Sequence, residues 1–186
     1  MAESPLHASD ALLEFWFSAE ARPRWFLEDR WLDREVNRRF ADLWEMAAEG
    51  HLDDWAGTPH GLLALVLLLD QVPRHMFRGT ERAYSTDARA LAWARIGVDR
   101  GDDALLDTTQ RRFLFLPFEH SENLSDQKRA VALFRRWNDD PGGLDYALRH
   151  RSVIERFGRF PHRNAALGRA TTPDEADFLA GRGAPY

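Results

Sequence analysis

Cysteine is absent from this sequence, which excludes disulfide bonds, thiolate metal ligands and a cysteine nucleophile. Long apolar runs are absent too, because the longest, residues 62–69, is far shorter than the roughly 20 residues of a membrane-spanning helix. The N-terminal residues 1–10 lack the basic-then-apolar pattern of a secretion signal. We therefore expect a cytoplasmic protein with no membrane partner.

Lysine is nearly absent, since the 25 basic residues are 24 arginines and Lys128. The formal net charge is −5 and no basic cluster stands out, which argues against a nucleic-acid partner. The arginine bias is typical of a GC-rich genome, and alternatively it supplies guanidinium groups that bind carboxylates or phosphates. No glycine-rich phosphate loop and no dinucleotide fingerprint occurs, so we expect no cofactor.

Apolar residues recur at helical spacing in almost every segment, and no segment alternates as a strand does. The segment over residues 59–69 is apolar on all sides, which predicts a central buried helix. No linker divides the chain, so residues 1–186 are expected to form a single all-helical domain. About nine helices are predicted: over residues 10–19, 28–49, 59–69, 85–100, 107–116, 121–138 and 144–157, then from Pro161 and from Pro173.

Three prolines, Pro73, Pro117 and Pro161, stand 44 residues apart, and each is followed within three residues by a histidine. Because proline cannot continue a helix, the three positions are predicted to be helix junctions. A spacing of this size is typical of one helix pair per repeat. We therefore expect an α–α superhelix whose corners bring the polar residues of the three junctions together.

The first junction contains Asp70, Gln71, Arg74 and Arg78, all of them candidate ligand-binding residues. Asp70 falls in the last turn of the apolar helix, where the helix dipole disfavours an anion, so it needs a nearby cation. Arg74 and Arg78 are the local candidates. Two interpretations stay open: a buried ion pair that fixes the corner, or a catalytic carboxylate with a shifted pKa.

The second junction contributes Arg112, His120, Glu122 and Gln127 as candidates. Gln127 falls on an apolar stripe, where its amide must find hydrogen-bond partners. Ser121 and Glu122 suit a helix cap and a first-turn acid. A serine–histidine nucleophile pair is the alternative, but the Gly-x-Ser-x-Gly elbow that favours it is missing.

The third junction contributes Arg159, His162, Arg163 and Asn164. Basic side chains at the start of a helix have the wrong sign for its dipole, so a negative group is expected beside them. That group is either an internal carboxylate such as Asp70 or an external anion that also contacts free backbone N–H groups.

Metal binding is not predicted, because no pair of histidine and glutamate residues has the spacing of a metal site. His150 lies on an apolar stripe with Ala147 and Ile154, which favours a core histidine over a ligand-binding one. The oligomeric state is left open by the sequence.

The three junctions together resemble the bacterial domain-of-unknown-function family 924, placed in the tetratricopeptide-repeat-like superfamily. The resemblance implies an α-superhelical fold and no particular activity. His75 departs from the family pattern, in which asparagine is expected. The matching blocks are residues 68–80 (LLDQVPRHMFRGT), residues 115–122 (FLPFEHSE) with Gln127, and residues 156–164 (RFGRFPHRN) with residues 167–169.

Two functional hypotheses follow. The first is a binding or scaffold protein in which His162 and the arginines of the junctions receive an anionic small molecule or a peptide carboxylate. Asp70, Glu122 and Gln127 would orient those cations. Guanidinium groups that are all paired with internal carboxylates would argue against this hypothesis. The second is a small-molecule hydrolase with His120 or His162 as general base, assisted by Asp70 or Glu122.

Overall fold

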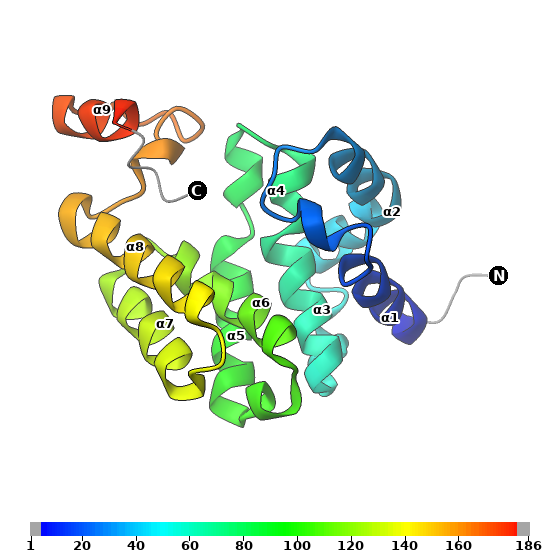
Figure 1. Cartoon of the computed structure of the whole chain (residues 1–186). Coiled ribbons are helices and arrows are strands. Elements are labelled where there is room, and N and C mark those ends of the chain that lie inside the picture. Colours follow the sequence, from blue (N-terminus) through cyan, green and yellow to red (C-terminus); the bar gives the residue numbers. More distant parts are fainter. Residues whose placement is uncertain (1–4, 182–186) are drawn as a thin grey trace.

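The computed structural model describes residues 5–181, which fold into helices with no strand among them. Figure 1 shows α3 among α1, α2, α5 and α6, with the N-terminal and C-terminal helices at opposite sides. The α-helices are α1 (Pro5–Trp16), α2 (Arg30–Glu49), α3 (Pro59–Asp70), α4 (Val72–Met76), α5 (Asp87–Arg100), α6 (Thr108–His120), α7 (Leu124–Trp137), α8 (Pro141–Phe157) and α9 (Pro173–Ala180). The 3₁₀ turns are η1 (Arg22–Arg24), η2 (Asp53–Gly57), η3 (Glu81–Tyr84), η4 (Asp102–Leu105) and η5 (Pro161–Arg163). The all-α prediction is confirmed.

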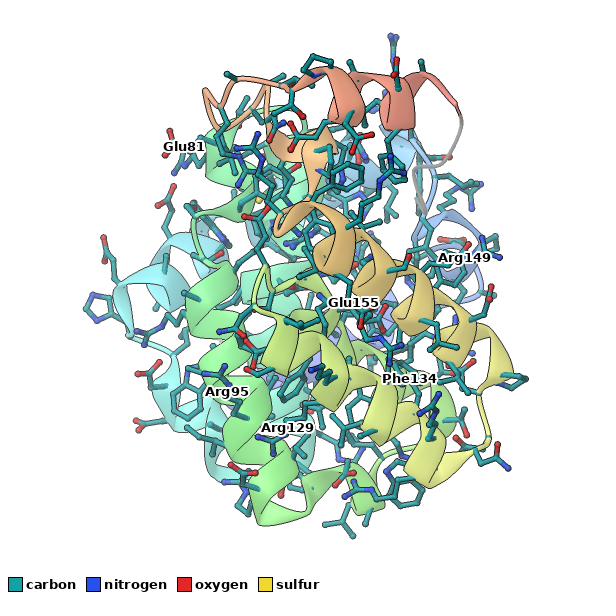
Figure 2. All side chains as sticks on the ribbon, turned by 90° about the vertical axis from the view of Figure 1, so that its left-hand side faces the viewer. Glu81, Arg95, Arg129, Phe134, Arg149 and Glu155 are labelled. Carbon is teal, nitrogen blue, oxygen red and sulfur yellow. The ribbon has the colours of Figure 1, made fainter. Side chains whose placement is uncertain are left out.

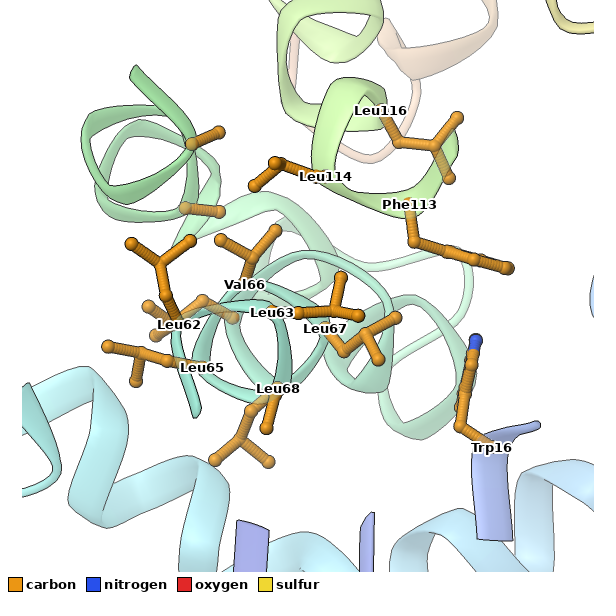
Figure 3. Close-up of a cluster of buried hydrophobic side chains, with 14 of the residues drawn as sticks. Trp16, Leu62, Leu63, Leu65, Val66, Leu67, Leu68, Phe113, Leu114 and Leu116 are labelled. Carbon is orange, nitrogen blue, oxygen red and sulfur yellow. The ribbon is translucent and has the colours of Figure 1, made fainter. Parts of the chain in front are cut away.

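Helix α3 is the centre of the hydrophobic core, as its all-round apolarity predicts. Every residue from Gly61 to Asp70 is buried, and α3 contacts α1, α2, α5 and α6. Figure 3 shows its leucines projecting in several directions, some of them toward Leu114 of α6. Close packing requires Gly97 of α5, because a Cβ atom there would lie 2.8 Å from Cδ2 of Leu62. The core therefore fixes α5 and α6 on α3.

Local capping signals set most helix ends. The side chain of Thr58 accepts a hydrogen bond from the N–H of Gly61 at 3.1 Å, and proline follows the cap as predicted. Complete capping boxes begin α6 at Asp107 and α9 at Thr172. Gly101 ends α5 with φ of 85°, a conformation that glycine adopts without strain. The first helix differs: it begins at Pro5 and ends at Trp16, earlier than predicted.

The three evenly spaced prolines occupy positions that are not equivalent. Pro73 and Pro161 lie in the first turns of α4 and η5, as junction residues should. Pro117 lies inside α6, which continues to His120, so the prediction that this helix ends before the proline is wrong. Residues 113–119 are all buried, and their packing offsets the cost of a proline in the helix, about 3 kcal/mol. The three prolines therefore do not mark equivalent positions.

Helix α7 also begins differently from the prediction. Its cap is Asn123, whose side chain accepts a hydrogen bond from the N–H of Ser125 at 2.9 Å. Ser121 instead donates its hydroxyl hydrogen to Asp126 at 2.8 Å. The outer face of α5, α7 and α8 is charged, with Arg95, Arg129 and others projecting outward in Figure 2. The apolar sides of these helices therefore face the core.

The C-terminal segment, from the end of α8 through α9, lies at the top in Figures 1 and 2, beyond the end of α8. Its own small cluster of Val153, Ile154 and Phe160 attaches it to the rest of the fold. The attachment places η5 beside the C-terminal end of α6 and the start of α4. None of the helices in residues 5–181 is long and apolar enough to cross a bilayer.

Candidate functional site

A cavity of about 370 Å³ lies where α4, the end of α6 and η5 meet. Residues of all three proline junctions reach it. Its polar lining residues are Gln71, Arg74, His75, Arg78, Arg112, Glu119, His120, His150, His162 and Arg163. Its apolar and aromatic lining residues include Trp25, Phe26, Leu27, Tyr84, Leu116 and Tyr146. Both the size and the mixture of walls are typical of small-molecule sites.

His120 of the cavity lining is bonded to Asp70, which lies behind the lining. Asp70 is fully buried at the end of α3, and its Oδ1 lies 2.8 Å from Nδ1 of His120. Its other oxygen, Oδ2, accepts a hydrogen bond from Nε2 of Gln71 at 2.7 Å. These contacts explain why an anion is tolerated at the C-terminal end of an apolar helix.

Charges around this pair set its protonation. Burial opposes ionisation of Asp70, but Arg74 and His120 outweigh it and hold the pKa of Asp70 below its ordinary range. Burial, and then the Arg74 guanidinium, lower the pKa of His120. At neutral pH the pair is therefore a carboxylate that accepts Nδ1–H from a neutral imidazole, and Nε2 carries a lone pair. Among the described residues no group hydrogen-bonds to that Nε2.

Arg74 and Arg163 share one further carboxylate, Asp87. Arg74 binds it with two hydrogen bonds, Nη1–Oδ1 at 2.8 Å and Nη2–Oδ2 at 3.0 Å, and also donates to the backbone oxygen of Asp70. Within residues 5–181, the carboxylate contact of Arg163 is the remaining one, Nη1–Oδ2 of Asp87 at 3.3 Å. Its Nε is buried without a hydrogen-bond partner, and its guanidinium lies 4.7 Å from the ring centres of both Tyr84 and Phe160. The sequence prediction did not include Asp87.

The two other arginines of the cavity have carboxylates of their own. Arg78 binds Asp33 at 2.8 Å, and Arg112 binds Asp140 with two hydrogen bonds, of which Nε–Oδ2 is 2.5 Å. Such pairing removes the excess positive charge that a broad anion-binding site needs. It argues against the hypothesis that the arginines of the junctions act together as an anion receptor.

Glu119 is the residue of the cavity that sequence reasoning missed. Its side chain is 1% exposed, and neither carboxyl oxygen has a hydrogen-bond partner in the described chain. Burial raises the pKa of Glu119 well above its ordinary value, so this carboxyl holds its proton to higher pH than an exposed glutamate does. Nδ1 of His150 lies 3.5 Å from its Oε2 but is directed to the backbone oxygen of Tyr146, at 2.9 Å.

Two more histidines line the cavity. Burial lowers the pKa of His150 to about 3, so this side chain is neutral, as predicted for a core histidine. Burial and Arg163 lower the pKa of His162 to about 3 as well, although more than a third of its surface is exposed. Both imidazoles are uncharged at neutral pH. The cavity therefore has little net charge.

Four candidate residues have structural contacts away from the cavity lining. Glu122 binds Arg169 at 2.7 Å and accepts the N–H of Phe160. Arg159 binds the buried Glu175 at 2.6 Å. These contacts join α7, η5 and α9, and they correct the expectation that Glu122 and Arg159 face a ligand.

The remaining two, Gln127 and Asn164, are buried amides. Nε2 of Gln127 donates to the backbone oxygens of Glu119 and Ser121, at 2.6 and 2.7 Å, where α6 leaves carbonyl groups unpaired. Asn164 bonds to Glu175 and accepts from Arg169. Neither is available to a ligand. No group of three metal-ligating side chains occurs within residues 5–181.

The fold and the site define an all-helical protein with a cavity that two aspartate–histidine pairs, Asp70–His120 and Asp33–His75, adjoin. The chain belongs to a family described as bacterial protein of unknown function (DUF924), which matches residues 12–183. It is similar to the protein of unknown function ATU0120 from Agrobacterium tumefaciens, with 38% identity and a TM-score of 0.90 over 96% of this chain and 99% of that one. A comparison with curated proteins gave no match.

Proposed function

We propose that this protein binds a small monocarboxylate with an apolar body in the cavity. The single observation behind the proposal is Arg163, a buried guanidinium that lines the cavity and whose Nε has no hydrogen-bond partner. A buried cation without full compensation is costly, and a ligand carboxylate supplies the missing acceptor.

The contrast with the other cavity arginines supports a single anionic group on the ligand. Arg78, Arg112 and Arg74 each have a bidentate or short carboxylate contact, whereas Arg163 has one contact of 3.3 Å. Burial, and then the neighbouring Arg74, lower the pKa of Arg163, which is the direction expected for a cation short of negative charge. One carboxylate satisfies this guanidinium, and a multiply charged anion finds no further free cation.

The apolar part of the lining supports an apolar body. Phe26 and Leu27 line the cavity but are 62% and 58% exposed, and Trp25 lies beside them. Burying this surface under a ligand contributes about 25 cal/mol per Å² of apolar area. An aromatic or aliphatic group attached to the carboxylate therefore fits the cavity.

Calorimetric titration with 3-phenylpropionate and with its neutral amide tests the proposal. The wild type should bind the carboxylate more tightly than the amide, and Arg163→Gln should lose at least about tenfold in affinity for the carboxylate, since truncating a buried charge partner costs 2–5 kcal/mol. Folding should survive, because Arg74 still pairs with Asp87.

Arg159→Ala is the matched control, because its guanidinium pairs with Glu175 outside the cavity lining. This variant should lose stability and keep the preference for the carboxylate. Equal binding of acid and amide to the wild type, or unchanged binding by Arg163→Gln, would contradict the proposal.

A further inference from the structure

We propose that the same cavity hydrolyses an acyl ester or amide, with His120 as general base and Glu119 as general acid. This inference rests on the proposed ligand site and adds a reaction to it. It is based on the positions of Glu119 and His120, which follow one another in α6 and line the same cavity. One of these side chains can donate a proton and the other can accept one.

His120 has the arrangement of an oriented general base. The 2.8 Å contact with Asp70 holds Nδ1–H on the carboxylate, so Nε2 is the atom that accepts a proton. Gln71 and Arg74 in turn hold Asp70, through a 2.7 Å hydrogen bond and a 3.6 Å ion pair. The imidazole is thereby fixed in one tautomer and orientation, as in aspartate–histidine pairs of hydrolases.

Glu119 is a carboxylic acid whose hydrogen-bonding capacity is unused. Both oxygens are buried and lack a hydrogen-bond partner in the described chain, so both can bond to a ligand in the cavity that Glu119 lines. Both groups have His150 as a neighbour: its Nδ1 lies 3.5 Å from Oε2 of Glu119, and its ring centre lies 6.3 Å from that of His120. All three residues line the same cavity, and we place the ligand in contact with both Glu119 and His120.

The reaction uses water as the nucleophile. The described lining residues include no serine or threonine, and the chain has no cysteine, so these three usual nucleophiles are not at hand. Nε2 of His120 takes a proton from a water molecule as the water oxygen bonds to the acyl carbon. The bond from that carbon to the leaving oxygen or nitrogen breaks, and Glu119 gives its proton to the leaving atom. The proton on His120 then passes through solvent to Glu119, which restores both groups.

Two chromogenic probes separate the roles: the mono-4-nitrophenyl ester and the mono-4-nitroanilide of adipic acid. Each has a carboxylate for Arg163 and an aromatic ring for Trp25 and Phe26. Nitrophenolate leaves without a proton, whereas an anilide nitrogen must be protonated to leave. The base is therefore needed for both probes and the acid only for the anilide.

The expected results differ between variants. His120→Asn should lower kcat on both probes by about 10²-fold or more, the usual contribution of general acid–base catalysis. Glu119→Gln should lower anilide hydrolysis by about 10²-fold and change ester hydrolysis by less than about threefold. His51→Asn is the matched control, because His51 makes an imidazole–carboxylate contact with Glu49 at the exposed surface, and it should hydrolyse both probes as the wild type does.

The pH dependence of hydrolysis by the wild type tests the roles of His120 and Glu119 without any substitution. For the ester, kcat/KM should rise to a plateau as His120 loses its proton, with a midpoint below the ordinary histidine pKa of about 6.5. For the anilide, it should fall again at higher pH as Glu119 ionises. The same profile for both probes would overturn the assignment of Glu119, and wild-type activity retained by a folded His120→Asn variant would overturn that of His120.

Failure of ligand recognition is distinguishable from failure of catalysis. Suppose that the hydrolytic proposal is correct but Arg163 binds no carboxylate. The neutral 4-nitrophenyl hexanoate is then hydrolysed as fast as the adipate ester, and His120→Asn still loses activity on both esters. If the wild type binds 3-phenylpropionate but neither ester nor anilide is hydrolysed faster than in buffer, the hydrolytic proposal is refuted and the binding proposal stands.

Discussion

Replacing Glu119 with glutamine should stabilise the protein at neutral pH and have little effect in acid. The carboxyl is 1% exposed, without hydrogen bonds, and burial raises its pKa well above the ordinary value. The folded state therefore keeps a proton that the unfolded state releases at a pKa of about 4.3. Because the folded state binds more protons, unfolding becomes easier as pH rises between the two pKa values. Glutamine has a similar shape and does not titrate.

The magnitude follows from linkage. Each pH unit between the unfolded and folded pKa values changes the free energy of unfolding by about 1.4 kcal/mol for one proton. Raising the pH from the unfolded-state pKa of about 4.3 toward the folded-state pKa of Glu119 should therefore cost the wild type about 1.4 kcal/mol per pH unit that Glu119→Gln does not lose.

Urea unfolding of both proteins at a series of pH values measures this difference. Groups far from Glu119 titrate alike in both proteins, so their contribution cancels when the two free energies are subtracted. The difference should grow with pH and level off above the folded pKa of Glu119. A difference that is the same at acid and neutral pH would refute the conclusion that this carboxyl is buried in its protonated form.

Two further predictions concern the histidines and the core. Burial lowers the pKa of His150 to about 3, so the unfolded state takes up a proton first as pH falls below about 6.5. The free energy of unfolding should then fall by up to about 1.4 kcal/mol per pH unit between about pH 6.5 and 3, and denaturant titration of His150→Asn should show a weaker dependence. Leu67→Ala in the centre of α3 should lower the free energy of unfolding by about 2–5 kcal/mol in the same assay, because Leu67 is fully buried. A decrease below about 1 kcal/mol would contradict the central position of this helix.

The elements that could be predicted from the sequence are those fixed by local chemistry. Thr58 with proline after it, and the capping box at Asp107, set helix starts that the structure retains. Apolarity on every side identified α3 as the buried centre. These signals succeed because the residues that decide the structure are neighbours in the chain.

Pro117 shows where local chemistry is insufficient. Proline disfavours a helix interior, but the buried residues around Pro117 hold α6 in its helical form to His120. The strength of that packing depends on α3 and α5, which lie elsewhere in the sequence. The pattern of neighbouring residues in the sequence therefore does not indicate how strong this packing is.

The same reason explains what was missed in the site. The carboxylates that neutralise the arginines lie far away in sequence: Asp33 is 45 residues from Arg78, and Asp140 is 28 residues from Arg112. Their pairing follows from the fold alone. Glu119 did leave a signal, because it stands four residues after the buried Phe115 and therefore on the buried face of α6.

A crystal structure of the protein with 3-phenylpropionate tests the central claim most directly. We expect the ligand carboxylate within hydrogen-bond distance of the Arg163 guanidinium, its ring against Trp25 and Phe26, and Nε2 of His120 facing the ligand. A ligand outside the cavity, with Arg163 still bonded to Asp87 alone, would contradict it.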